Sequence, residues 1–226
     1  MAFPLICVGC DRRLQHTAGA LPLCPSCLRR LPRAGPETAG LRIARLPAEA
    51  PRPERTLALW SFDAGGTIRR VQHALKYGGR PALGVDIGAL VGRALAEAWG
   101  APAYAAIVPV PLARSRLLER GYNQAEAIAR GVAERAPGHS RSPPVADMLV
   151  RARSTSSQTR LSRSDRRANV AGAFALGAGA DARIAGRRVL LVDDVLTTGA
   201  TLSAACAPLL LAGADVDAVV MACVED

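Results

Sequence analysis

The residues with the clearest chemical potential form one short stretch, VLLVDDVLTTGAT, which runs from Val189 to Thr201. In it, two carboxylates, Asp193 and Asp194, directly follow four apolar residues. An apolar run without polar alternation is typical of a strand buried on both faces of a parallel sheet. Ligands of open α/β sheets bind beyond the carboxyl ends of such strands, where these acids stand. Adjacent carboxylates repel unless they point apart or meet hydroxyl donors or a cation, so a sugar diol or a divalent metal is the expected ligand.

The segment after the acids is suited to a phosphate group. It offers three hydroxyls and the backbone N–H groups of a helix start, from Thr197, Thr198, Gly199, Ala200 and Thr201. Such N–H groups bind phosphate directly and through the helix dipole. The lysine of the Walker A loop is missing, which disfavours a nucleoside triphosphatase. Acids for a diol and hydroxyls for a phosphate together match a ribose 5-phosphate. The alternative is an ordinary helix capped by Asp194, Thr197 or Thr198.

Four N-terminal cysteines form two C-x-x-C pairs. The pairs, CVGC and CPSC, have 13 residues between them and consist of Cys7, Cys10, Cys24 and Cys27. Paired knuckles of this kind suit tetrahedral zinc, and a site of four thiolates leaves no open position, so the zinc is expected to be structural. The alternatives are two disulfides, which a reducing cytosol disfavours, and four free thiols, which would be a liability if exposed in two C-x-x-C pairs. Cys206 and Cys223 have apolar neighbours and are predicted to be buried packing residues.

An arginine-rich segment occupies residues 151–170. Its first 17 residues contain six arginines, one acid and seven serines or threonines. Such a run cannot build a core. We expect a lid that closes on a polyphosphate, because guanidinium forks bind phosphates bidentately. The arginines expected to act on the polyphosphate are Arg151, Arg160, Arg163 and Arg166, with Arg160 and Arg163 as the predicted catalytic pair. The alternatives are an arm that contacts nucleic-acid phosphates and a merely solvated loop.

A second basic segment, LARSRLLERGYNQ, follows the predicted strand IVPVP at 107–111. Its place at the carboxyl end of a strand predicts a pyrophosphate-binding loop that includes Pro111, Arg116 and Arg120. An ordinary strand-to-helix connection is the alternative.

The chain as a whole alternates strands and helices. Strands are expected at 56–62, 107–111, 189–192 and 217–224, with helical stretches between them. This alternation predicts an α/β fold with a parallel sheet. Three parts are expected: a small zinc ribbon at 1–32, a loose linker at 33–55, and an α/β domain at 56–226.

The charge balance points to no specific partner. The net charge is +10, but the chain has 28 arginines and one lysine, which indicates compositional bias as much as selection for polyanions. No apolar stretch is long enough to span a membrane. The start, MAFPLICVGCDRR, has no basic region ahead of its apolar run and does not resemble a signal peptide. These features predict a cytoplasmic protein.

The motifs resemble those of a known family. VLLVDDVLTTGAT is similar to the phosphoribosyl-pyrophosphate motif of type I phosphoribosyltransferases. CVGC…CPSC resembles the N-terminal zinc ribbon of the ComF/GntX-like, competence-associated members of that superfamily. ALKYGG, VPVPL…RGYNQA and R-x-R…Q-x-R-L-S…R-x-x-N-V-x-G-A-F resemble further blocks of the family, in order over nearly the whole length. The resemblance implies a type I phosphoribosyltransferase fold for 56–226.

The resemblance also implies roles for individual residues. Asp193 and Asp194 would hold the ribose 2- and 3-hydroxyls, and residues 197–201 the 5-phosphate, with Mg²⁺ accompanying the pyrophosphate. Pyrophosphate would leave the anomeric carbon through an oxocarbenium-like state, so the protein would act by positioning and charge stabilisation. Purine-type members carry an acid where this chain has Thr197, so the motif offers no carboxylate base. Lys76 and Tyr77 lie near the acceptor by family position, or simply end a helix.

Family membership implies a part in DNA uptake during natural transformation, alongside single-stranded DNA and a helicase-like partner. Two other functions stay open. One is a non-catalytic accessory whose ribbon and arginine loops bind single-stranded DNA. The other is nucleotide salvage with an unidentified base, because no residue pattern specifies a nucleobase pocket or an acceptor.

Overall fold

The computed structural model describes residues 6–14, 21–63, 66–100, 102–135, 143–151 and 172–225. Its centre is a parallel sheet of four strands in the order β1-β6-β5-β2. The strands are β1 (Arg55–Phe62), β2 (Ala106–Pro109), β5 (Arg188–Leu196) and β6 (Asp215–Val224). The central strands β5 and β6 carry long buried runs, as strands covered on both faces require. The predicted α/β fold with a parallel sheet is confirmed.

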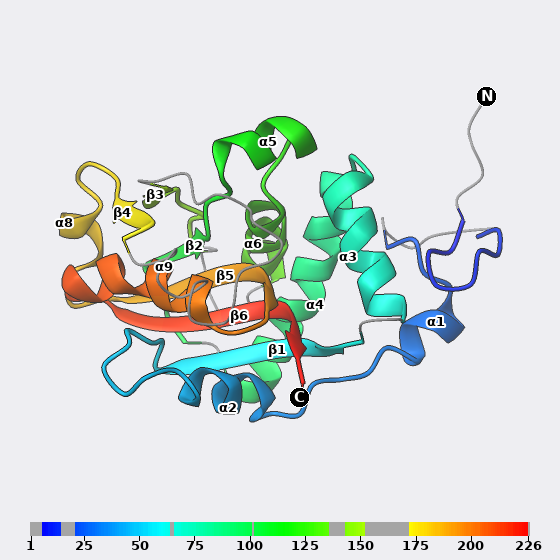
Figure 1. Cartoon of the computed structure of the whole chain (residues 1–226), viewed down its shortest axis with the longest axis horizontal. Helices are drawn as coiled ribbons and strands as arrows, with labels where there is room; N and C mark the ends of the chain where they lie inside the picture. The colour runs from blue at the N-terminus through cyan, green and yellow to red at the C-terminus, as the bar shows by residue number, and fades with distance from the viewer. Residues whose placement is uncertain are drawn as a thin grey trace.

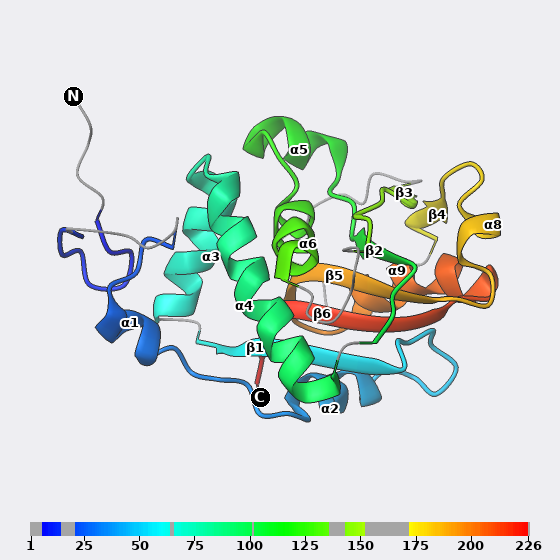
Figure 2. The same ribbon diagram turned by 180° about the vertical axis from the view of Figure 1, so that it is seen from behind.

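Helices cover both faces of the sheet (Figure 1). On one face lie α3 (Thr67–Tyr77), α4 (Pro81–Trp99) and α6 (Gln124–Arg135), which Figure 2 shows from their own side. The other face carries α9 (Ala200–Leu211). Glycines let α4 and α6 meet closely, because a Cβ added to Gly88 would lie 2.0 Å from the carbonyl oxygen of Ile128. Within the described residues, no helix is long and apolar enough to cross a membrane.

Residues 33–55, expected to be a loose linker, are partly ordered against the sheet. They contain α2 (Thr38–Ala44), whose Ala39 and Ile43 are buried on the α9 side of the core. The chain just before α2 runs along the outer edge of β1, where the N–H of Ala34 donates to the carbonyl of Leu59 at 3.3 Å. Covering this edge protects the unpaired backbone groups of β1.

The basic segment after β2 also differs from the expected loop. It forms a short helix, α5 (Arg114–Arg120), which ends at Gly121 in the left-handed conformation with φ of 78°. Arginine, leucine and glutamate are strong helix formers, and glycine provides the left-handed stop. The remaining small elements are α1 (Pro25–Arg29), α8 (Asp181–Ile184) and the antiparallel pair β3 (Leu149–Arg151) with β4 (Phe174–Leu176).

The amino ends of the strands are tied together by a buried carboxylate. Asp217 is fully buried in β6 and accepts hydrogen bonds from Arg55 of β1, Arg188 of β5 and the hydroxyl of Tyr104. Burial and the Asp217 charge raise the pKa of Tyr104 well above its usual range. The buried charge of Asp217 is therefore met by hydrogen-bond donors and by two guanidinium groups. This end of the sheet is opposite the predicted ligand site.

Candidate functional site

The two acids lie near the carboxyl end of β5, but inside the strand rather than after it. Strand β5 pairs with β6 as far as Leu196 opposite Cys223, whereas its pairing with β2 ends at Val192. The last hydrogen bond on the β2 side runs from the N–H of Val110 to the carbonyl of Val192, at 2.9 Å. Both acids therefore extend beyond the end of the neighbouring strand, at the open edge where ligands of such sheets bind.

The side chains of Asp193 and Asp194 have different neighbours in the fold, although the two carboxyl groups remain within hydrogen-bonding reach of each other. Val220, the β6 partner of Asp193, packs in the core on the α9 side. Asp194 instead meets Lys76, which α3 brings from the other face. The two acids still influence each other, because the charge and the side chain of Asp194 both raise the pKa of Asp193. The repulsion between adjacent carboxylates is therefore met by neighbouring donors and cations rather than by separation.

Asp194 has a partner for each of its carboxylate oxygens. Its Oδ2 lies 3.0 Å from Nζ of Lys76, and its Oδ1 accepts from the N–H of Val195 at 2.8 Å. The two side chains of this ion pair are only 22% and 19% exposed, so water screens their attraction weakly.

Asp193 is the more strongly perturbed acid. Burial raises the pKa of Asp193, and the charge of Asp194 raises it further, whereas the N–H of Asp194 and the charge of Lys76 lower it. That N–H donates to Asp193 Oδ1 at 2.8 Å. Burial lowers the pKa of Arg151, at the end of β3, and the charge of Asp193 acts in the opposite direction. Two cations, Lys76 and Arg151, therefore act on Asp193.

The loop after the acids is shaped as the start of a helix. Gly199 is the N-cap of α9 and has a left-handed φ of 83°. A Cβ there would lie 3.2 Å from Cδ1 of Ile43, so α2 packs tightly beneath the loop. The guanidinium of Arg42 donates to the carbonyl oxygen of Thr197. The side chains of Thr197 and Thr201 are exposed.

The first N–H groups of α9 are consequently available to a ligand. The N–H of Ala200 approaches Oγ1 of Thr198 at 3.4 Å, a long contact, and the following N–H groups of a first helical turn have no intrahelical acceptor. The five residues of the predicted phosphate segment thus form one N-terminal cradle a few residues after the acids.

The residues predicted to bind pyrophosphate lie near this edge of the sheet, but each has different neighbours. Pro111 follows β2, and Arg116 forms an ion pair with Glu119 of its own helix at 2.7 Å. Arg120 donates to Gln124 at 2.9 Å, and its guanidinium lies 5.6 Å from the ring centre of Tyr77. Arg120 therefore reaches Tyr77 at the end of α3, next in sequence to Lys76, which forms the ion pair with Asp194. Of the predicted lid, Arg160, Arg163 and Arg166 lie outside the described residues.

The four N-terminal cysteines come together as the sequence predicts. Their sulfur atoms all lie within 4.8 Å of one another, and Cys10 Sγ is 3.8 Å from Cys24 Sγ. Four thiolates around zinc at about 2.3 Å would be separated by about 3.8 Å in a tetrahedron. The N–H of Cys24 donates to Cys7 Sγ at 3.3 Å, which favours the thiolate that a metal needs. The cluster can hold a metal ion such as zinc.

This cysteine module rests on α3. Cys7 is fully buried among residues of the α3 side of the core, and Cys206 and Cys223 are buried on the opposite side, as expected. Arg70 of α3 donates to the carbonyl of Gly9 at 3.5 Å and lies 3.3 Å from Asp11. The same helix carries Lys76 at its other end, so α3 connects the cysteine module to Asp194.

Two site residues were not identified from the sequence. Arg42 holds the carbonyl of Thr197, and Asn123 donates to the carbonyl of Val110 at 3.0 Å while accepting from Ala125 at 3.1 Å. The second has a sequence signal, since Asn before an apolar-periodic segment is a strong N-cap. Arg42 has no such sequence signal, because its helix is separated from Thr197 by most of the chain.

Comparison with known proteins agrees with this geometry. Residues 117–226 match the phosphoribosyl transferase domain family. The chain is 40% identical over 98 residues to competence protein F of Haemophilus influenzae, a match that covers 43% of this chain and 41% of that protein. It is 28% identical over 212 residues to DNA utilization protein YhgH of Salmonella typhi, covering 92% of this chain and 86% of that protein.

The domain match contains both acids, the start of α9 and α5 apart from its first turn. The similarity to the second relative extends to nearly the whole chain. The parallel sheet, the matched domain and these relatives together support a ComF-like, type I phosphoribosyltransferase family for the chain.

Proposed function

We propose that the protein binds phosphoribosyl pyrophosphate with Mg²⁺, transfers its phosphoribosyl group to an acceptor, and acts in DNA uptake. One observation carries the ligand: two acids at the open edge of the sheet precede, by a few residues, a helix N-terminus with exposed hydroxyls. The acids accept hydrogen bonds from the ribose hydroxyls, while residues 197–201 bind the 5-phosphate through N–H groups and the helix dipole.

The remaining charges of the substrate would be met by cations. Pro111, Arg116 and Arg120 line the side where the pyrophosphate extends, and Mg²⁺ arrives with that group. Arg160 and Arg163 stabilise the charge that develops as pyrophosphate leaves, because oriented guanidinium groups are strong partners for phosphate oxygens. The protein itself supplies position and charge rather than a covalent intermediate.

The cysteine module would contribute structure. Zinc bound by the four thiolates stabilises the fold of the first 32 residues, and a closed set of four protein ligands leaves no position for a substrate. Residues 33–55 would connect this module to the catalytic domain at 56–226. Close thiols kept reduced fit the cytoplasm, where we place the protein.

The ligand is tested by calorimetric titration of the zinc-loaded protein with phosphoribosyl pyrophosphate and Mg²⁺. Binding is expected for the unchanged chain and for Asp181→Asn, an exposed acid of α8 that controls for net charge. It should be lost in the Asp193→Asn, Asp194→Asn double variant while the melting temperature is kept. Equal affinity in all three proteins would contradict the proposal. Release of pyrophosphate on adding candidate acceptors then tests turnover.

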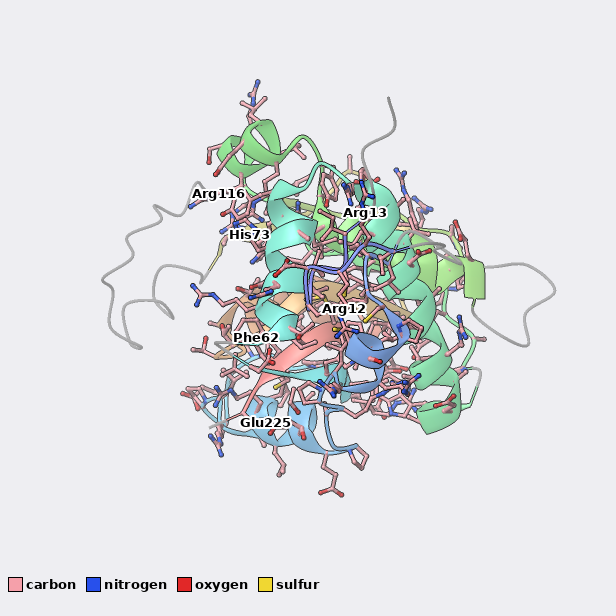
Figure 3. All side chains as sticks on the ribbon, turned by 90° about the vertical axis from the view of Figure 1, so that its right-hand side faces the viewer. Arg12, Arg13, Phe62, His73, Arg116 and Glu225 are labelled. Carbon is pink, nitrogen blue, oxygen red and sulfur yellow. The ribbon has the colours of Figure 1, made fainter. Side chains whose placement is uncertain are left out.

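A second candidate function is a non-catalytic accessory that binds single-stranded DNA. Four exposed arginines on the cysteine module favour it, namely Arg12, Arg13, Arg29 and Arg30. In Figure 3, Arg12, Arg13 and Arg116 lie on the side that also shows Phe62 and Glu225, at the carboxyl ends of β1 and β6. Basic side chains there could track a phosphate backbone.

The names of the relatives, a competence protein and a DNA utilization protein, agree with such a partner, and a helicase-like protein would act beside it. The signature of this function is a steep fall of single-stranded DNA affinity with salt, because each neutralised phosphate releases counterions. Replacing the four module arginines with glutamine should flatten that dependence. DNA affinity that ignores salt and these substitutions would argue against it.

A further inference from the structure

Lys76 is the one lysine of a chain that otherwise uses arginine for its side-chain cations. It stands in the last turn of α3, and its ammonium group lies 3.0 Å from Asp194 Oδ2. Lysine is a compact point charge on a flexible stem, whereas arginine presents a planar fork that spans two acceptors. A single carboxylate oxygen, with the other oxygen already bonded to the N–H of Val195, suits the point charge.

We propose that Lys76 is a positioning residue of the ribose site: it compensates the charge of Asp194 and holds that carboxylate oriented to accept a hydrogen bond from a ribose hydroxyl. The inference rests on the proposed function, because it takes the acids to be the diol site. It adds a role for α3, which contributes the cation although its residues precede the matched phosphoribosyl transferase domain.

The role of Lys76 follows from the balance of charges around Asp193 and Asp194. Two cations act on the acids: Lys76 of α3 pairs with Asp194 and its charge also reaches Asp193, and Arg151 of β3 interacts with the charge of Asp193. Removal of Lys76 leaves the Asp194 carboxylate beside a second acid without the cation that contacts it, in a partly buried setting where an uncompensated charge is costly.

A proton is the simplest replacement for the missing cation. A protonated carboxyl donates a hydrogen bond where the ribose hydroxyl also needs to donate, so one acceptor is lost. The effect is confined to ligands that carry the diol. Inorganic pyrophosphate has no diol and should bind as before, which separates a positioning role from a general loss of structure.

The first test compares Lys76→Met with the unchanged chain by calorimetry, using phosphoribosyl pyrophosphate with Mg²⁺ and inorganic pyrophosphate with Mg²⁺. At pH 7 we expect about tenfold weaker binding of the sugar ligand, the effect of one charged hydrogen bond. The loss should shrink at pH 8.5, as the pair releases its proton, and pyrophosphate affinity should not change. Lys76→Arg should recover most of the affinity, and the exposed Arg93→Met should behave as the unchanged chain.

Unchanged sugar affinity in Lys76→Met, or an equal loss for both ligands at both pH values, would overturn the inference. Should Lys76→Met fail to fold, Lys76→Gln removes the charge and keeps a hydrogen-bond donor.

A second readout needs no ligand. The carboxyl ¹³C resonances of the aspartates, followed against pH, should show a higher titration midpoint for the pair in Lys76→Met than in the unchanged chain. An identical midpoint would overturn the role of Lys76 whatever the ligand does. Failure of the unchanged chain to bind phosphoribosyl pyrophosphate would instead remove the proposed function, so the two failures are distinguishable.

Discussion

Nζ of Lys76, in the last turn of α3, lies 3.0 Å from Oδ2 of Asp194, the second of two adjacent acids in β5. This relationship makes an acidic pair tolerable near the edge of a buried strand. Both acids also lie a few residues before the start of α9, so the proposed sugar and phosphate sites belong to one continuous segment of chain.

The buried state of Asp193 predicts a pH dependence of stability. Burial raises the pKa of Asp193 in the folded chain, so the unfolded chain ionises first as the pH rises above about 3.9. The free energy of unfolding should therefore fall between that pH and neutrality, with this acid opposing folding once the solvent is less acidic than its unfolded pKa. Asp193→Asn should remove that slope and be the more stable protein at pH 7. Urea unfolding at pH 5 and pH 7 measures it. A variant less stable than the unchanged chain at pH 7 would contradict the assignment.

Gly199 should be intolerant of a side chain for two separable reasons. Its φ of 83° strains any other residue, and a Cβ would press on Ile43 and Leu46 at 3.2 and 3.3 Å. Gly199→Ala should lower the free energy of unfolding by about 1 to 3 kcal/mol. Gly213 has a similar φ of 78° but open space around it, so Gly213→Ala isolates the backbone cost. Equal losses in the two variants, measured by urea unfolding, would show that the contact with α2 is unimportant.

Metal removal should loosen α3. The cysteine module contacts this helix through Cys7 and Arg70, and the far end of the helix holds Lys76 against Asp194. Chelation, or Cys10→Ser, should lower the melting temperature and speed hydrogen exchange in residues 67–77, while residues 215–224 keep their protection. Arg70→Gln, which keeps the cysteines, should give a smaller effect of the same kind. Unchanged exchange in α3 after verified metal loss would refute this coupling.

Asp217 should be essential for stability and not for ligand affinity. Its replacement by Asn leaves Arg55, Arg188 and Tyr104 at the amino ends of the strands with an incomplete acceptor. Breaking such a buried charge network typically costs about 3 kcal/mol. Denaturant unfolding measures the loss. Calorimetry at a temperature where the variant is folded should show the same phosphoribosyl pyrophosphate affinity as the unchanged chain, and a loss of about tenfold would contradict this separation of roles.

The sequence was informative where local pattern decides the structure. The apolar run before Asp193 predicts a central strand, and the paired C-x-x-C motifs predict four sulfurs in one place, because both signals lie in contiguous or closely spaced residues. Whether Arg160 and Arg163 act as a catalytic lid stays a prediction, since they lie outside the described residues.

The sequence was less informative where tertiary contacts decide. Strand β5 continues through the acids because β6 pairs with it as far as Leu196, which no property of β5 alone reveals. Helix α2 forms within a Pro- and Ala-rich segment because the sheet buries Ala39 and Ile43. The contact of Lys76 with Asp194 joins residues far apart in the chain. Local propensity cannot supply such information.

The central claim is that a ribose phosphate binds at the acids and the start of α9, and backbone amide NMR with ribose 5-phosphate tests it most directly. The account predicts that the amide resonances of Gly199, Ala200 and Thr201 shift first and furthest, and that the Asp193→Asn, Asp194→Asn double variant weakens the response. Shifts confined to other surfaces, or equal shifts in the double variant, would contradict it.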